Sequence, residues 1–317
     1  MATRRPGGRY ASKRKEQDCV EFLSGIVEGK TTGASIELSI ENQDAKSKDY
    51  NFLPHHPRPG HQDMVMHKRT KGEADLRGGG MSSARLTAPL VAAAAFVAPL
   101  LAPLGIKAEA QVGAIGNVEA GEMEHQPARW STDACKEMRC RDPDAAEAMV
   151  NLVESQRMNL NSIGSRVDLI VTGTPLGLGE PWFDGIEPAM ARAMMSIPAA
   201  RGVTFGRGFN VVNMTGLEHN DAWGGSPESP TPLGERPDGV LAGLATSAPI
   251  RCSVAFKPPS SIASEQKTLH LESGAIEPLT VKGRHDPVLG PRAVAVVEAM
   301  AILVLTDLAL RGGFIDG

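Results

Sequence analysis

The sequence predicts a fold of the α+β class. Short strand-like runs lie near the N-terminus, and two long helical patterns, residues 144–159 and 293–310, follow later in the chain. The 317 residues show no regular strand–helix–strand spacing of the kind that builds a parallel, doubly wound sheet. We therefore expect helices packed against antiparallel strands.

The first half of the chain is expected to open with a basic loop and a set of strands. Residues 19–40 alternate in short apolar runs punctuated by glycine, which is typical of strands joined by tight turns. Residues 46–80 are polar and rich in His, Pro and Gly, and long ordered loops are usually functional. Residues 81–104 are predicted to be helical. A strand around residues 110–118 and a polar excursion through residues 121–144 are expected to follow.

The second half alternates helices and strands. Apolar side chains recur near a 3.6-residue period in residues 144–159, which predicts an amphipathic helix. Further helices are predicted at residues 188–195 and 293–310. Strands or strand pairs are predicted at residues 167–171, 203–212, 250–256 and 269–281. Residues 224–239 are rich in Pro, Gly and Ser and are predicted to form a mobile loop.

Composition places the chain among soluble globular proteins. Its hydrophobic fraction is 41% and its charged fraction 22%. The net charge of −4 argues against a dedicated nucleic-acid binder. The cysteines show no C-x-x-C spacing and no secretory context, so reduced thiols and a cytoplasmic protein are expected.

Two terminal or apolar segments allow other interpretations. Residues 86–106 have the length of a membrane span, but Pro89, Pro99 and Pro103 interrupt them, so a buried alanine-rich helix is expected instead. Residues 1–15 contain six cations and no acid. They could form an organellar transit peptide or a basic tail that binds a nucleic acid, although a phosphate site explains them better.

Three blocks carry the residue types needed to hold phosphate and move a proton. They are residues 58–63 (RPGHQD), 77–85 (RGGGMSSAR) and 283–287 (GRHDP). Arginine forks suit phosphate and carboxylate groups, and histidine is a suitable proton donor near neutral pH. The glycines at 78–80 allow backbone amides to approach an anion where a helix begins.

A cluster of histidines accompanies the first block. His55, His56, His61 and His67 have neither the i, i+4 spacing of a helical metal site nor that of a known zinc finger. No metal is therefore expected. His61 is singled out as the functional histidine, and the other three are expected to lie on the surface.

In this order, the blocks resemble the chorismate synthase family, whose members carry RPGHAD, RGGGRSSARETA and KGRHDP. Residues 28–33 (EGKTTG), 218–221 (EHND) and 256–258 (FKP) extend the resemblance along the whole chain. It implies one domain over residues 1–317, with a helical layer sandwiched between antiparallel sheets, that assembles as a homotetramer. It also implies a lyase that converts 5-enolpyruvylshikimate 3-phosphate to chorismate with reduced FMN, and NADPH as a possible flavin reductant.

The resemblance implies roles for individual residues. His61 would donate a proton toward reduced flavin, and Asp286 would assist the uptake of the substrate's proton. Arg5, Arg58 and Arg85 would bind the substrate. The implied cofactor-binding residues are Arg4, Arg9, Met81, Ser82, Ser83, Pro198, Ala199, Ala242, Lys257, Pro258, Pro259, Ser260, Ser261 and Arg284.

The chain also departs from the family pattern. Met81 and Leu86 replace a family arginine and glutamate, and Ala242 replaces a glycine, so cofactor affinity is in question. The family's early GESHG segment, with its first catalytic histidine, has no counterpart before Arg4. Two alternatives therefore stay open: an active chorismate synthase, or a shortened homologue that binds flavin or assembles but catalyses poorly or not at all.

Overall fold

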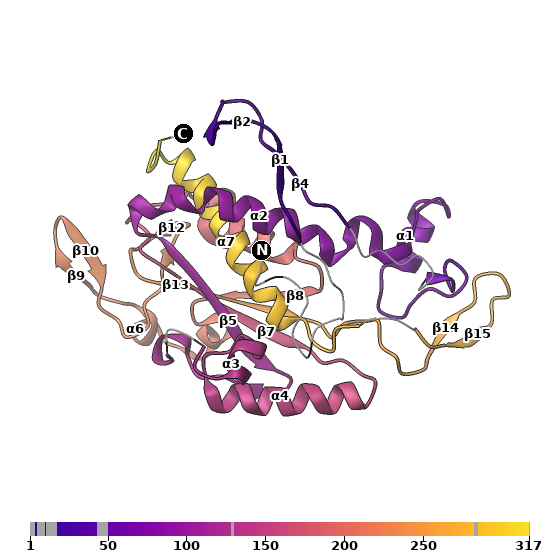
Figure 1. Ribbon diagram of the computed structural model, residues 1–317. Helices are drawn as coiled ribbons and strands as arrows, with labels where there is room; N and C mark the ends of the chain where they lie inside the picture. Colours follow the sequence, from indigo (N-terminus) through magenta and orange to yellow (C-terminus); the bar gives the residue numbers. More distant parts are fainter. Residues whose placement is uncertain are drawn as a thin grey trace.

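A five-stranded antiparallel sheet lies at the centre of the computed structural model, which describes residues 4, 10, 18–42, 50–127, 130–281 and 285–316. Its strands run in the order β6-β5-β7-β13-β8 (Figure 1). Their bounds are β5 Lys107–Ile115, β6 Val118–Glu119, β7 Ser165–Thr172, β8 Ala200–Phe205 and β13 Ile250–Phe256. In β13 the side chains of Ile250, Cys252, Val254 and Phe256 are buried, while the residues between them are more exposed. This alternation turns one face of the strand to the core.

Helices cover one face of this sheet. Helix α7 (Gly290–Arg311) packs against β5 and β7, and α2 (Thr87–Val97) and α5 (Ile186–Met195) pack against α7. Val297, Ala301 and Leu305 of α7 are fully buried at a spacing of four residues. That spacing places them on one side of the helix, so the apolar composition of α7 is explained by its position in the core.

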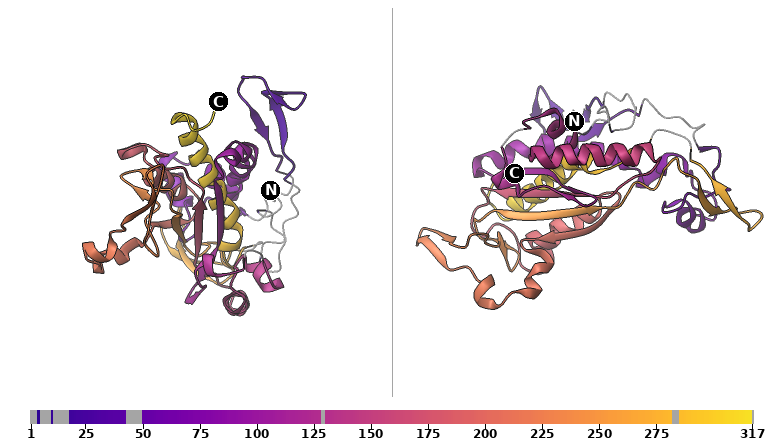
Figure 2. Two further views of the ribbon diagram at one scale, coloured as in Figure 1. Left: turned by 90° about the vertical axis from the view of Figure 1, so that its left-hand side faces the viewer. Right: turned by 90° about the horizontal axis from the view of Figure 1, so that it is seen from below.

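A second layer of strands lies on the other side of α2. Strands β1 (Glu21–Ser24) and β4 (Glu37–Ser39) pair antiparallel, and β4 contacts α2 (Figures 1 and 2). The ring of Phe22 lies 5.5 Å from that of Phe96 on α2. The helices therefore lie between antiparallel strands, which confirms the predicted α+β class and its helical layer.

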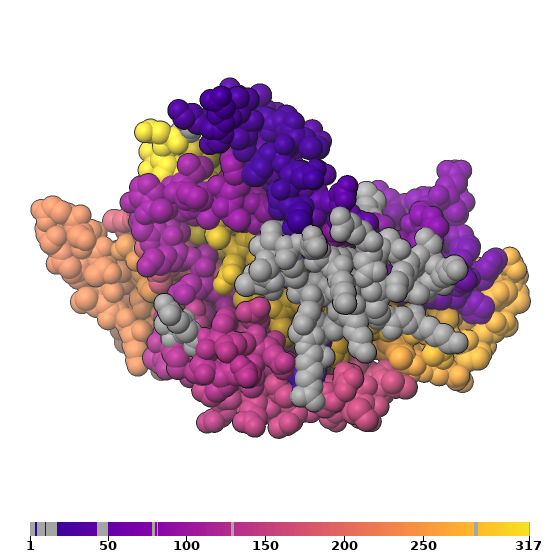
Figure 3. All heavy atoms as spheres, viewed as in Figure 1, coloured from indigo at the N-terminus to yellow at the C-terminus, as the bar shows by residue number. Residues whose placement is uncertain are grey.

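Four further short strand pairs in the described residues lie outside the central sheet. The pairs are β2 Ile26–Val27 with β3 Lys30–Thr31, β9 Trp223–Ser226 with β10 Ser229–Pro232, β11 Val240–Leu241 with β12 Leu244–Ala245, and β14 Gln266–Leu269 with β15 Ile276–Leu279. The β9–β10 and β14–β15 hairpins lie at opposite ends of the molecule, and the β1–β4 region stands above it (Figure 3). The β9–β10 hairpin overlaps residues 224–239, where a mobile loop was expected; mobility of this segment stays a prediction.

The strongly periodic segments were predicted correctly. Helix α4 (Pro143–Met158), helices α5 and α7 and strand β13 lie at the predicted positions, whereas the β14–β15 pair begins at Gln266, before the predicted start at residue 269. Short elements were missed. Residues 46–80 contain α1 (Asp63–Arg69), the polar excursion contains α3 (Asp133–Met138), and residues 208–213 form a 3-10 turn, η7, instead of a strand.

Two helical stretches, Ala84–Leu104 and Gly290–Arg311, are long and apolar enough to cross a membrane. Core helices of soluble proteins meet the same criteria, and 67% of the window in α7 is buried within the protein. Only 33% of the first window is buried. The expected buried helix is therefore found only on one face, with Ala88, Val91 and Ala94 buried, while Leu90 and Leu100 are exposed. The α-helix also ends at Val97, and the proline-containing residues that follow form the 3-10 helix η4 (Ala98–Leu104).

No disulfide joins the cysteines, which all lie in the described part of the chain, and Cys135, Cys140 and Cys252 are buried. Burial raises the pKa of the Cys252 thiol to about 12, which makes it a packing residue and a poor nucleophile.

Candidate active site

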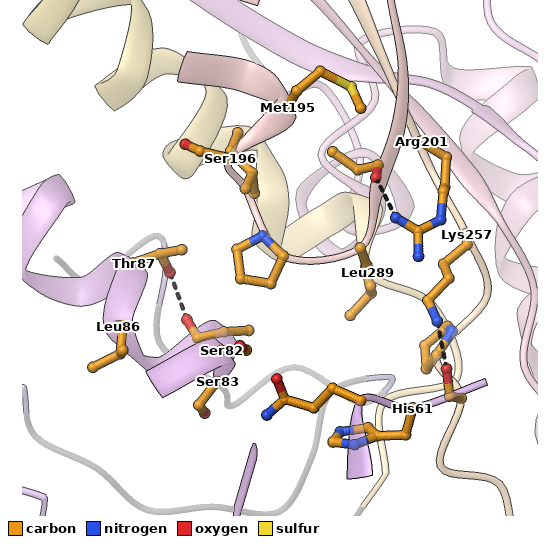
Figure 4. Close-up of a pocket in the computed structure, with 18 of the residues that line it drawn as sticks. His61, Ser82, Ser83, Leu86, Thr87, Met195, Ser196, Arg201, Lys257 and Leu289 are labelled. Atoms are coloured by element: carbon orange, nitrogen blue, oxygen red, sulfur yellow. Dashed lines mark hydrogen bonds between the residues drawn. The ribbon is translucent and has the colours of Figure 1, made fainter. Parts of the chain in front are cut away.

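A cavity of about 780 Å³ opens where four segments of the chain meet. The loop before α1, the short 3-10 helices before α2, the turn between α5 and β8, and the end of β13 supply its walls. Figure 4 shows His61 facing Met195 and Ser196 across the cavity, with Ser83 and Leu86 on one flank and Arg201 and Lys257 on the other. Its size is typical of a site for a small molecule or cofactor.

Most of the described candidates around the flavin come together here. The predicted residues that line the cavity are His61, Ser82, Ser83, Pro198, Ala199, Lys257, Pro259 and Ser260. Their segments are up to two hundred residues apart in the sequence. Antiparallel pairing of β13 with β8 brings the end of β13 beside the turn that starts β8, because Phe256 is paired with Ala200.

Positive charge gathers at one side of the cavity. The Nζ of Lys257 donates hydrogen bonds to Ser260 Oγ at 2.8 Å and to the carbonyl oxygen of Gly60. Burial lowers the pKa of Lys257, and the neighbouring Arg201 lowers it further. Two adjacent cations of this kind are stabilised by an anion, so this side of the cavity suits a phosphate group.

Other walls of the cavity are apolar. Leu86, Leu90, Met195, Ile197 and Met300 line the same cavity. Apolar side chains of this kind suit a flat ring system, and methionine adapts readily to an aromatic surface. One cavity therefore offers a cationic, hydroxyl-rich end and an apolar region.

His61 is held by two charged residues. Its Nδ1 lies 2.6 Å from Oδ1 of Asp63. The Nε and NH2 groups of Arg58 donate to the two oxygens of Asp63 at 2.7 and 2.8 Å. Burial alone would raise the pKa of Asp63, but the hydrogen bonds from Arg58 and His61 outweigh it and hold that pKa well below its usual range.

A smaller cavity of about 70 Å³ adjoins the first. Arg4, Asp286 and Arg292 line it, and it shares Thr87, Pro198 and Leu289 with the larger one. Asp286 accepts a hydrogen bond from Arg292 at 2.6 Å. The predicted carboxylate therefore lies beside the main cavity, within its own ion pair.

The buried guanidinium of Arg4 lies close to that of Arg85. Both donate to Asp18, and Arg4 also donates to Thr87 Oγ1 at 3.1 Å. Arg85 further reaches the carbonyl oxygen of Glu41 at 2.9 Å. Arg58 and Arg85, both predicted to bind the substrate, thus have intramolecular acidic partners and are not among the residues that line the larger cavity.

Other predicted residues lie elsewhere. Ala242 is exposed in the turn between β11 and β12, at a φ of +52°, and is not among the lining residues of either cavity. Ser261 accepts a hydrogen bond from Arg58, and Pro258 precedes the lining residues of its loop. Arg5, Arg9 and Arg284 lie outside the described residues, as does the side chain of Met81.

Sequence reasoning missed Arg201, Gln62 and Ser196, which also line the larger cavity. Gln62 stands inside the RPGHQD block, which was a usable signal. Arg201 directly follows Ala199 and Ala200, both close to the predicted turn, but a lone arginine at the start of a strand carries no pattern of its own.

His55, His56 and His270 form a separate group. His56 Nε2 lies 2.9 Å from Glu277 Oε2, and His55 Nδ1 lies 3.1 Å from Glu272 Oε1. His270 packs against both histidine rings. These side chains are of types that bind metals, and their ligand atoms lie within 4.8 Å of one another in two overlapping sets. Each carboxylate is already within hydrogen-bond distance of a histidine, so the arrangement is also explained without an ion.

Comparison with known proteins identifies the family. A profile described as chorismate synthase matches residues 1–310. The chain belongs to the chorismate synthase family. The chorismate synthase of Aeropyrum pernix is 45% identical over 314 residues, which cover 98% of this chain and 82% of that protein. The chorismate synthase of Methanosarcina mazei is 40% identical over 314 residues, covering 99% of this chain and 86% of its own length.

A solved structure agrees with the fold. A crystal structure of chorismate synthase superimposes with a TM-score of 0.65 at 25% identity, covering 92% of this chain and 77% of that one. The resemblance that the motifs suggested along the whole chain is therefore confirmed over almost all of it.

Proposed function

We propose that this chain converts 5-enolpyruvylshikimate 3-phosphate to chorismate by 1,4-anti elimination of phosphate, in the cavity that His61, Ser83 and Lys257 line. Family membership gives it a lyase activity of the shikimate pathway, on the way to the aromatic amino acids. The proposal rests on one observation: a single cavity combines a cationic end, apolar walls and a histidine.

The residues present fit reduced FMN. Lys257, Arg201 and the hydroxyl groups of Ser82, Ser83 and Ser260 offer donors for a phosphate, and Leu86, Leu90 and Met195 offer an apolar surface for a ring. When bound, reduced FMN lends an electron transiently and recovers it, so the elimination has no net redox change.

The chain's own groups would then perform three tasks. Lys257 and Arg201 stabilise negative charge in a cavity partly shielded from water. His61 holds a proton that it can donate into the cavity. Asp286, which lines the adjoining cavity together with Arg4, would assist the uptake of the substrate's proton.

We extend the proposal to partners and location. The substrate is a small phosphorylated carboxylic acid, and a homotetramer in the cytoplasm is the expected assembly. NADPH is proposed as a possible source of electrons for the flavin. Leu100, an exposed apolar side chain on the 3-10 helix η4 that follows α2, is available for a contact between subunits.

Anaerobic formation of chorismate, followed by its absorbance with reduced FMN and substrate, tests the function. We expect turnover by the wild-type protein and a fall of about 10²- to 10⁴-fold for His61→Ala, with flavin binding retained. His67→Ala serves as the matched control, because His67 is a half-buried histidine of α1 that lines neither cavity, and it should keep the wild-type rate. Flavin binding without any turnover by the wild-type protein would favour the alternative of a homologue that does not catalyse.

A further inference from the structure

Asp63 has an unusual environment for an acidic residue. It is the first residue of α1, and its carboxylate is 0% exposed. Arg58 donates to it three times: from the backbone N–H at 3.0 Å, from Nε at 2.7 Å and from NH2 at 2.8 Å. The remaining contact is His61 Nδ1, at 2.6 Å. A buried charge with this many partners is paired and fixed in orientation.

The contact with His61 decides which ring nitrogen carries a proton. An ionised carboxylate can only accept hydrogen bonds, and a nitrogen at 2.6 Å from it must therefore donate. Arg58 NH2 lies 3.1 Å from the same Nδ1, but a guanidinium also only donates, and its shorter contact is to Asp63. Nδ1 thus carries a hydrogen. Nε2 is the ring nitrogen left for a molecule in the cavity.

Arg58 is itself held in place. Its NH1 group donates to Ser261 Oγ at 3.3 Å, and its guanidinium lies 5.6 Å from the centre of the Tyr50 ring. All three nitrogens of the guanidinium have partners within the protein. A residue so engaged acts on the cavity through Asp63 and His61 instead of reaching the substrate directly.

We propose that Asp63, fixed by Arg58, is a positioning residue that sets the tautomer and ring orientation of His61, so that Nε2 delivers the proton. This proposal rests on the proposed function of His61. Before transfer the ring is a cation with hydrogens on both nitrogens, and the carboxylate stabilises that charge. The Nε2–H bond then breaks, the proton passes to the acceptor in the cavity, and the ring remains as the neutral Nδ1–H tautomer. The hydrogen bond from Nδ1 to Asp63 stabilises both the cationic ring and the neutral Nδ1–H tautomer.

The tautomer can be measured without substrate or flavin. In full-length protein labelled with ¹⁵N-histidine, two-bond ¹H–¹⁵N spectra distinguish Nδ1–H from Nε2–H, and His61→Gln assigns the signal. We expect Nδ1–H in the wild-type protein at pH values where the ring is neutral. Asp63→Asn should shift His61 toward the Nε2–H form, because an amide can also donate to Nδ1.

Kinetics provide the second measurement. Asp63→Asn should lower kcat on the order of 10²- to 10⁴-fold with little change in KM, as expected when a proton-transfer histidine takes the wrong tautomer. Arg58→Lys keeps the charge but loses the fork, and it should show a smaller change in the same direction. This variant decides the matter if Asp63→Asn does not fold.

Asp168→Asn is the matched control. Asp168 accepts from Nε and NH2 of Arg166 at 2.8 and 3.1 Å on strand β7, and it is not among the residues lining either cavity. Its loss should lower stability without changing the His61 spectrum. An unchanged spectrum in both Asp63→Asn and Arg58→Lys, or Nε2–H in the wild type, would overturn the proposal. A wild-type protein without turnover contradicts the proposed function instead, and the spectra still decide the tautomer.

Discussion

Lys257 and Gly60 lie in contact at the edge of the large cavity, although 197 residues separate them in the sequence. The Lys257 ammonium donates to the carbonyl oxygen of Gly60, and Ser260 Oγ donates to the same oxygen at 2.7 Å. Gly60 directly precedes His61. These hydrogen bonds connect the residues after β13 to the loop that carries the proposed proton donor. A change in one segment should therefore alter the conformation of the other.

Replacing Gly60 tests this connection. Gly60 has a φ of +65°, and a Cβ there would lie 3.3 Å from Ser260 Oγ. We expect Gly60→Ala to cost about 1 to 2 kcal/mol of stability from the left-handed backbone, and also to weaken FMN binding by displacing the Ser260 loop. Thermal unfolding and flavin titration measure the two effects.

Gly29→Ala is its control. Gly29 has a φ of +75° in the turn between β2 and β3, and nothing lies within 4 Å of its added Cβ. It should lose stability similarly and bind FMN normally. Equal flavin affinity in Gly60→Ala and the wild type would show that the two loops are not coupled.

Lys257→Met tests the cationic side of the cavity. The variant keeps most of the side-chain length but loses the charge and both hydrogen bonds. We expect FMN binding to weaken by about 1.5 to 3 kcal/mol, the range for hydrogen bonds to charged groups, which is roughly 10- to 100-fold. Lys267→Met, at an exposed position of β14, should leave the affinity unchanged. Quenching of flavin fluorescence measures the affinity. Equal affinities for the two variants would show that Lys257 does not bind the flavin.

The sequence predicted long elements better than short ones. Helix α7 has 22 residues of nearly continuous apolar character, so its pattern was sufficient. Helices α1 and α3 have seven and six residues, too few for a periodic signal, and depend on surrounding contacts. In residues 208–213, Phe209 and Val212 are 83% and 77% exposed. Their apolar character suggested a strand, but no core lies against them.

The residues of the candidate site could be predicted from motifs, but the ion pairs among them could not. His61, Ser83 and Lys257 were found because each stands in a recognisable block, and the fold brings these blocks together. The partners of Arg58 and Arg85 could not be predicted in this way. Asp63 lies inside the RPGHQD block, but only the turn before α1 directs its carboxylate at Arg58. Asp18 pairs with Arg85, which lies 67 residues further along the chain.

Leu305→Ala tests whether α7 is the central core helix. Leu305 is fully buried, whereas Leu310 near the end of the same helix is 38% exposed. We expect Leu305→Ala to destabilise the protein by about 2 to 5 kcal/mol, because a cavity remains in a close-packed core. Leu310→Ala should cost clearly less. Chemical denaturation compares them, and similar losses would mean that α7 is not buried as described.

Acid should remove the stabilisation that the Arg58–Asp63 pair provides. The folded-state pKa of Asp63 is held below its unfolded value near 3.9, because the hydrogen bonds from Arg58 and His61 outweigh the effect of burial. A carboxylate with a depressed pKa stabilises the fold above its unfolded pKa, and this contribution is lost as the pH falls below about 4 toward the folded pKa. We therefore expect Asp63→Asn to be less stable than the wild type at pH 7, and the difference between them to shrink between about pH 5 and pH 3.

Asp75→Asn is the control. Asp75 also forms an ion pair with an arginine, Arg77, but the Asp75 side chain is 59% exposed, so water screens the pair. Its stability should follow the wild type at every pH. Urea unfolding at stepwise pH measures both variants, and a constant difference between Asp63→Asn and the wild type down to pH 3 would contradict a charged, paired Asp63.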